Sequence, residues 1–267
     1  MLFQKTPIRY IYAKINLRSG KGHEIILLKT TACMNFFDNS IIKFVNGFSR
    51  TSNLFDFIIA HIVANDLLKG APFALALVFF WFQKSPKIKS NRGIIVMGLM
   101  ASLVSIVVAR SMALLLPFRV RPFLNPDLHF VRPFGMNTEG LETWSSFPSD
   151  HAVLFFSLST CIFLISRKSG IIACLYAFFV VCFPRIYQGL HYPTDVLFGA
   201  VLGIGIMMIL AKEKIRKPVV QKVFYFSSRY TGLFYVLLSL WLFQIATIFE
   251  KARDILHDLV ALLEKIR

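Results

Sequence analysis

Long apolar runs separated by short basic loops restrict what this chain can fold into more than any other feature. The six runs cover residues 71–83, 93–116, 152–166, 170–183, 195–211 and 231–248. A transmembrane helix needs about 20 apolar residues, so polar flanks must complete the shorter runs. The chain is also 56% hydrophobic, whereas soluble domains are about 45–50% apolar. The sequence therefore predicts an all-α, polytopic membrane protein with a bundle of six transmembrane helices.

The positive charge indicates which way the bundle faces. Much of the net charge of +16 comes from lysines and arginines in three loops, 84–92, 167–168 and 212–229. By the positive-inside rule these loops are cytoplasmic, so loops 117–151 and 184–194 lie on the outer face of the plasma membrane. Membrane electrostatics accounts for the charge, and no nucleic-acid-binding motif accompanies it. We therefore expect a lipid bilayer, and no nucleic acid, as partner.

The two ends of the chain are patterned differently from the middle. Residues 1–33 form a basic extension with little pattern, and Met34 is a candidate for the natural start. Residues 34–64 mix apolar and polar positions at helical spacing, which predicts interfacial helices, although residues 54–68 could instead form a seventh span. Residues 251–267 predict a terminal amphipathic helix that lies in the interface or packs on the protein itself. The four cysteines have no metal-binding spacing and are interpreted as small apolar residues.

Three polar clusters lie in or next to the two outward loops. They are PFRVRP with Arg119 and Arg121, PSDH with Ser149 and His151, and RIYQGLHYPTD with Arg185, His191 and Asp195. Each has a structural alternative, namely a headgroup contact, a helix N-cap and a helix start. All three lie on one predicted face of the membrane, which favours a shared site.

Together these side chains suit chemistry on a phosphate group. Guanidinium groups, a serine hydroxyl and the N–H groups of a helix start can hold a tetrahedral anion. One histidine can then attack phosphorus while the other protonates the leaving oxygen. Asp195 follows His191 by four residues, within one turn if that segment is helical, and would support its second nitrogen. This spacing favours His191 as nucleophile and His151 as acid.

The pattern RP … PSxH … Rx5Hx3D resembles that of the type 2 phosphatidic acid phosphatase (PAP2) superfamily of membrane lipid phosphatases. It covers residues 110–200 closely and 34–250 more loosely, so the resemblance makes 34–250 the phosphatase domain. It implies a phosphohistidine at His191 supported by Asp195, protonation by His151, and phosphate binding by Arg121, Ser149 and Arg185. It also implies a metal-independent reaction, and we expect no cofactor.

Three positions depart from the family pattern. Leu114 stands where the first motif has a lysine, and Arg119 or Arg110 is expected to supply the missing cation. Asp150 replaces the usual glycine of the second motif, where it would hold His151 or bind a second donor. Pro184 replaces the usual serine before Arg185.

The resemblance leaves the substrate open among membrane lipid phosphates. The PSDH variant and the short architecture look most like the undecaprenyl-diphosphatase branch, which dephosphorylates undecaprenyl diphosphate. Phosphatidylglycerophosphate, phosphatidic acid and lipid A phosphates are alternatives. A lipid phosphotransferase and a non-catalytic lipid-binding or transport protein also remain open, whereas a haloperoxidase is disfavoured in an integral membrane bundle. The sequence predicts no oligomeric state.

Overall fold

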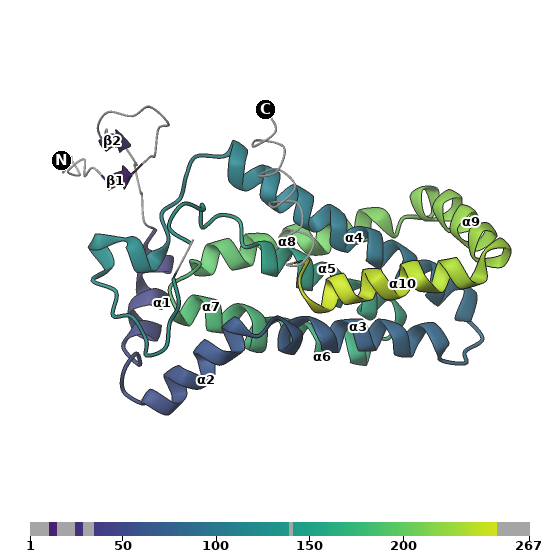
Figure 1. The fold of residues 1–267 in the computed structure, drawn as a ribbon, viewed down its shortest axis with the longest axis horizontal. Coiled ribbons are helices and arrows are strands. Elements are labelled where there is room, and N and C mark those ends of the chain that lie inside the picture. Colours follow the sequence, from purple (N-terminus) through teal and green to yellow (C-terminus); the bar gives the residue numbers. More distant parts are fainter. Residues whose placement is uncertain (1–10, 15–24, 29–34, 139–140, 250–267) are drawn as a thin grey trace, which may run out of the picture.

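The chain folds into a long helical bundle with two short strands beside one end (Figure 1). The computed structural model describes residues 11–14, 25–28, 35–138 and 141–249, and side chains in the last two ranges. Strands β1 (Ile11–Lys14) and β2 (Ile25–Leu28) pair antiparallel, with Ile11 opposite Leu28. The helices are α1 (Phe36–Asn46), α2 (Asn53–Ala64), α3 (Asp66–Phe82), α4 (Ile88–Leu115), α5 (Asp150–Ile165), α6 (Arg167–Tyr176), the π-helical η3 (Ala177–Cys182), α7 (Phe183–Tyr187), α8 (Pro193–Leu210), α9 (Glu213–Arg229) and α10 (Thr231–Ala246), with short 3-10 turns η1 (Pro122–Leu124) and η2 (Pro126–Leu128).

Each of the six predicted apolar runs forms helix, which confirms the all-α membrane fold. Among the described residues, α4, the continuous helix Arg167–Tyr187 and α8 are long and apolar enough to cross a membrane. Helices α2 and α3 meet that criterion only as a pair bent by 57°, and α5 and α10 are shorter apolar helices. The count of six spans therefore stays a prediction.

Helix α5 lies at the centre of the bundle, where it packs against α4, α6 and α8. Its side chains Leu154, Phe155 and Leu158 are fully or almost fully buried in the main core. On α8, Gly199 and Gly203 face α5, so the two backbones approach closely. This small-xxx-small spacing is a usual device of membrane helix pairs, because dispersion contacts replace the hydrophobic effect inside lipid.

Two parts of the fold differ from or refine the predictions. Residues 213–229, predicted as part of a basic loop, form helix α9, whose apolar side chains pack against the main core. The prediction was wrong because apolar residues recur at helical spacing among the lysines, for example Val219 and Val223. Residues 54–68 fall across the bend between α2 and α3. Residues 251–267 and most of 1–33 lie outside the described residues, so the predictions for them stay predictions.

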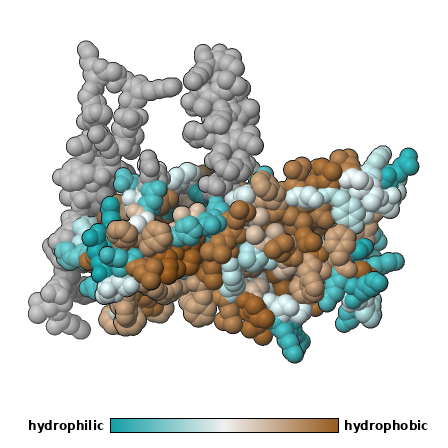
Figure 2. All heavy atoms as spheres, turned by 60° about the horizontal axis from the view of Figure 1, so that its bottom comes forward, coloured by the Kyte–Doolittle hydropathy of each residue, from teal (hydrophilic) through white to brown (hydrophobic). Residues whose placement is uncertain are grey.

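The exposed surface agrees with a lipid environment. Figure 2 shows apolar side chains over much of the bundle and hydrophilic groups toward its two ends. Large apolar residues are exposed on several helices, for example Leu75, Val201 and Leu240. Patches of this extent would be costly in water.

The α5–α8 contact makes a prediction with an internal control. A Cβ at position 203 would meet the Val153 carbonyl and lie 3.0 Å from the Ser157 nitrogen, whereas at Gly205 it would meet nothing within 4 Å. Backbone atoms cannot turn aside, so Gly203→Ala should lower the free energy of unfolding by about 1–3 kcal/mol. Gly205→Ala should leave it equal or raise it by up to about 1 kcal/mol. Thermal unfolding in detergent measures both, and equal midpoints would contradict the close packing.

Candidate active site

The three polar clusters meet at one end of the bundle. The loop after α4 carries Arg119 and Arg121, α5 begins at Asp150, and the α7–α8 junction carries His191. Because α5 and α8 pack side by side, their N-terminal ends are neighbours, and the Ser149 N–H donates to the Asp195 carbonyl at 3.3 Å. The connections at 83–87 and 211–213, where two of the basic loops begin, lie at the opposite end (Figure 1). The structure therefore brings together the predicted outward clusters and separates them from the basic loops.

His151 is held at both ring nitrogens by charged groups. Its Nδ1 lies 2.7 Å from Asp150 Oδ1, and its Nε2 lies 2.6 Å from Arg185 Nη2. A guanidinium can only donate, so Nε2 must be the acceptor and Nδ1 carries the proton toward the carboxylate. Asp150 also accepts from Arg110 Nη2 at 2.7 Å through its other oxygen. The described geometry thus gives His151 a directly bonded carboxylate.

His191 has a different partner at the same nitrogen. Its Nδ1 lies 2.7 Å from the Ser146 carbonyl oxygen, whereas Asp195 Oδ2 is 4.0 Å away. A carbonyl only accepts, so Nδ1 carries the proton and Nε2 presents its lone pair. Burial, and then the charges of Arg121 and Arg185, hold the pKa of His191 well below its usual 6.5. The ring is therefore neutral at physiological pH, as a nucleophile must be.

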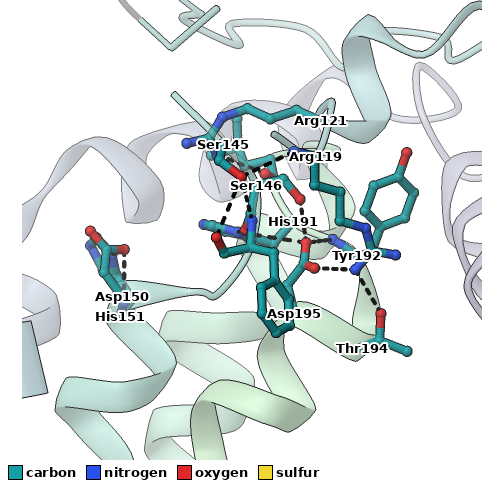
Figure 3. Close-up of polar contacts among 12 residues, drawn as sticks. Arg119, Arg121, Ser145, Ser146, Asp150, His151, His191, Tyr192, Thr194 and Asp195 are labelled. Carbon is teal, nitrogen blue, oxygen red and sulfur yellow. Dashed lines mark hydrogen bonds and ion pairs between the residues drawn. The ribbon is translucent and has the colours of Figure 1, made fainter. Parts of the chain in front are cut away.

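Asp195 belongs to a buried network that reaches α1. One carboxylate oxygen pairs with Arg119, and the other accepts from the Ser146 hydroxyl and from the Tyr192 N–H at 2.8 Å. Arg119 also pairs with Asp38 of α1 at 2.6 Å and stacks over the Tyr192 ring at 4.2 Å. Figure 3 shows Arg119 and Asp195 turned toward each other, with Ser146 beside His191. Asp195 and Asp38 are fully buried, so Arg119 neutralises two carboxylates.

This network changes two expectations about side-chain roles. Both terminal nitrogens of Arg119 contact carboxylates, so the geometry favours a structural role over the predicted phosphate contact. Asp195 supports His191 indirectly, through Ser146, which donates to Asp195 and accepts from His191. Ser146 and Asp38 were missed by the sequence reasoning. Ser146 stands within the same SSFPSDH stretch as His151, but nothing in the sequence links Asp38 to position 119.

Three of the predicted phosphate ligands lie near the histidines, namely Arg121, Ser149 and Arg185. Arg121 is 7% exposed and donates to the carbonyls of Leu190, Trp144 and Leu141. Burial lowers the pKa of Arg121 to about 10, which leaves it cationic at neutral pH.

Ser149 completes the polar end of α5. It occupies the N-cap position without a side-chain capping bond, and its hydroxyl is buried with no hydrogen-bond partner among the described residues. A buried hydroxyl in that state costs free energy unless a ligand satisfies it. The hydroxyl, the helix N-terminus and the guanidinium groups together form a candidate anion site. Within the described ranges there is no group of three or more His, Cys, Asp or Glu side chains that could hold a metal.

The comparisons with known proteins agree with this geometry. Residues 96–214 match the family model of the PAP2 superfamily. The chain is 35% identical over 135 residues to the bacitracin transport permease protein BcrC of Bacillus licheniformis, which covers 49% of this chain and 59% of that protein. It is 27% identical over 164 residues to the undecaprenyl-diphosphatase BcrC of Bacillus subtilis, covering 61% and 77%. The chain thus spans less than two thirds of the first relative's length.

One solved structure also resembles this chain. It is a transmembrane PAP2-type phosphatidylglycerolphosphate phosphatase from Bacillus subtilis, with 22% sequence identity and a TM-score of 0.33. The match covers 69% of this chain and 80% of that one.

The bridging position of Arg119 makes a prediction about stability. Arg119→Met would leave Asp38 and Asp195 buried without their shared cation, which typically costs about 3–5 kcal/mol. Arg132→Met removes an exposed arginine from the same loop and should change stability little. Thermal unfolding in detergent compares the two variants. An unchanged midpoint for Arg119→Met would contradict the structural role and restore the predicted phosphate contact.

Proposed function

We propose that this chain, whose residues 96–214 belong to the PAP2 superfamily, is an integral membrane lipid phosphatase that works through a phosphohistidine. The single observation that carries the proposal is the pair of differently held histidines. His191 presents a neutral Nε2 lone pair, whereas His151 has a carboxylate that can stabilise its protonated form. That difference matches a nucleophile and an acid.

The reaction follows from these two environments. Arg121, Arg185, Ser149 and the start of α5 bind the phosphate, and His191 Nε2 attacks phosphorus. The P–O bond to the leaving group breaks, and His151, protonated at Nε2 once that atom no longer accepts from Arg185, gives the proton to the leaving oxygen. Water then attacks the phosphohistidine, His151 takes a proton from the water, and the P–N bond breaks to release inorganic phosphate. Charge that develops on the phosphoryl oxygens is stabilised by preorganised guanidinium donors.

Undecaprenyl diphosphate is the proposed substrate, with undecaprenyl phosphate and inorganic phosphate as products. The proposal draws on the PSDH motif and on the named activity of the Bacillus subtilis relative. The cationic side chains of Arg121 and Arg185 at this end also suit a highly charged diphosphate. We place the site at the outer face of the plasma membrane, because the basic loops lie at the other end of the bundle.

Release of inorganic phosphate from a panel of lipids tests this function. Purified protein with EDTA should hydrolyse undecaprenyl diphosphate faster than phosphatidylglycerophosphate or phosphatidic acid. His191→Asn should reduce the rate by about 10³-fold or more, because no lone pair remains to attack phosphorus. His61→Asn changes an exposed histidine of α2 and is the matched control. An active His191→Asn protein, or a rate that depends on added metal, would contradict the phosphohistidine mechanism.

The lowered pKa of His191 fixes the acid side of the pH profile. Protonation of Nε2 abolishes the nucleophile, so activity is present above the pKa of His191 and is lost as pH falls through it. Because that pKa lies below 6.5, the acid limb of log kcat/KM should lie below pH 6.5. The substrate's own ionisation, measured by ³¹P NMR titration, must be subtracted first. An acid limb at or above pH 6.5 after that correction would contradict the burial of His191.

A further inference from the structure

Asp150, one departure from the family pattern, contacts Arg110, which lies one helical turn from a second departure, Leu114. Asp150 replaces a glycine of the second motif, and Leu114 replaces the lysine of the first. Leu114 is 74% exposed. Arg110 lies four residues, about one helical turn, before Leu114 on α4. Its Nη2 donates to Asp150 Oδ2 at 2.7 Å. The cation missing from position 114 and the acid gained at position 150 thus belong to one arrangement.

Asp150 uses its two oxygens on different partners. Oδ1 contacts the His151 Nδ1 at 2.7 Å and also accepts from the His151 backbone N–H at 2.8 Å. Oδ2 is occupied by Arg110, whose guanidinium also stacks over the Trp144 ring at 4.8 Å. A carboxylate fixed at both oxygens can turn neither toward Arg185 nor toward the phosphate. Its negative charge is therefore directed at the His151 ring.

We propose that Asp150 and Arg110 are positioning residues that align the His151 ring and stabilise the imidazolium that forms when His151 acts as the acid of the reaction. The proposal rests on the proposed function and gives a defined role to two residues, Asp150 and Arg110, for which the sequence left alternatives open. Asp150 holds the Nδ1 proton, so Nε2 faces Arg185 and the leaving oxygen. Arg110 keeps Asp150 in place and offsets the negative charge that an extra carboxylate brings to an anion site. In the reaction, His151 Nε2 releases its contact with Arg185, takes up the proton that water supplies in the hydrolysis step, and gives it to the next leaving oxygen, while the Nδ1 proton stays on His151.

A variant whose general acid is impaired can be distinguished from a variant that is partly unfolded by comparing its rates on two substrates. A general acid matters most when the leaving oxygen is strongly basic and little when the leaving group departs unaided. Phenyl phosphate and 4-nitrophenyl phosphate differ in this respect but share a ring of the same size. The ratio of their rates, measured on one protein preparation, reports the acid independently of how much protein is folded.

The experiment measures kcat/KM on both aryl phosphates for wild type and variants. Asp150→Asn keeps the shape but removes the charge, and it should lower the rate on phenyl phosphate by about 10- to 100-fold, part of the roughly 10²–10⁴-fold that a general acid supplies. The rate on 4-nitrophenyl phosphate should change less than about 3-fold. Glu142→Gln removes an exposed acid from the adjoining loop and should leave both rates unchanged.

The role of Arg110 is tested by asking whether the effect of its substitution depends on Asp150. Arg110→Met should lower the phenyl phosphate rate selectively, and Arg110→Lys should restore part of it. The double variant Asp150→Asn/Arg110→Met should be no worse than Asp150→Asn alone, because Arg110 acts through that carboxylate. Equal losses on both substrates, or strictly additive losses, would overturn the proposal while leaving the phosphatase activity established. A wild-type protein that cleaves neither aryl nor lipid phosphates would instead overturn the proposed function, and this inference with it.

Discussion

Ion pairs between buried or partly buried charges organise much of the active end of this bundle. Arg119 joins Asp38 and Asp195, Arg110 joins Asp150, and Lys69, which is 1% exposed, pairs with Asp66 at 2.6 Å. An ion left alone at such positions costs several kcal/mol, so each pair ties together the elements that supply it. Arg119 and its two partners connect α1, the loop after α4 and the start of α8. The catalytic end is therefore held by charge pairing, whereas the middle of the bundle is held by close apolar packing.

Two histidines in one site acquire different properties because their Nδ1 atoms face different oxygens. The Ser146 carbonyl fixes the tautomer of His191, and burial together with the charges of Arg121 and Arg185 keeps the ring unprotonated. A carboxylate fixes the tautomer of His151 and favours its protonated form, against the burial and the Arg185 charge that lower the pKa of the ring. In the proposed reaction the two rings serve opposite steps, and their different partners at Nδ1 come from the SSFPSD segment.

Hydropathy and motif spacing predicted the helices and the main members of the site, but not their contacts. The i,i+4 spacing brings Asp195 to 4.0 Å from His191 but not into a hydrogen bond, because His191 precedes α8. Tyr192 is the N-cap, and the Asp195 side chain turns back to cap its N–H. Asp38 was beyond prediction for another reason: it contacts Arg119 across 81 residues of sequence, and a single chain gives no signal for such a pairing. Helix α9 was missed because positive charge masked its apolar spacing.

The position of Arg110 shows how a membrane site can replace one cation by another. A lysine at position 114 would stand on a surface where Leu114 and Leu115 are 74% and 84% exposed. With leucines there, that surface is apolar up to the polar end, which suits a substrate whose hydrocarbon chain stays in the bilayer. The cation is instead Arg110, one helical turn earlier on α4, whose long side chain reaches inward to the carboxylate of Asp150. Asp150 supplies that carboxylate, so the loss of lysine at position 114 and the gain of an acid beside His151 are physically coupled.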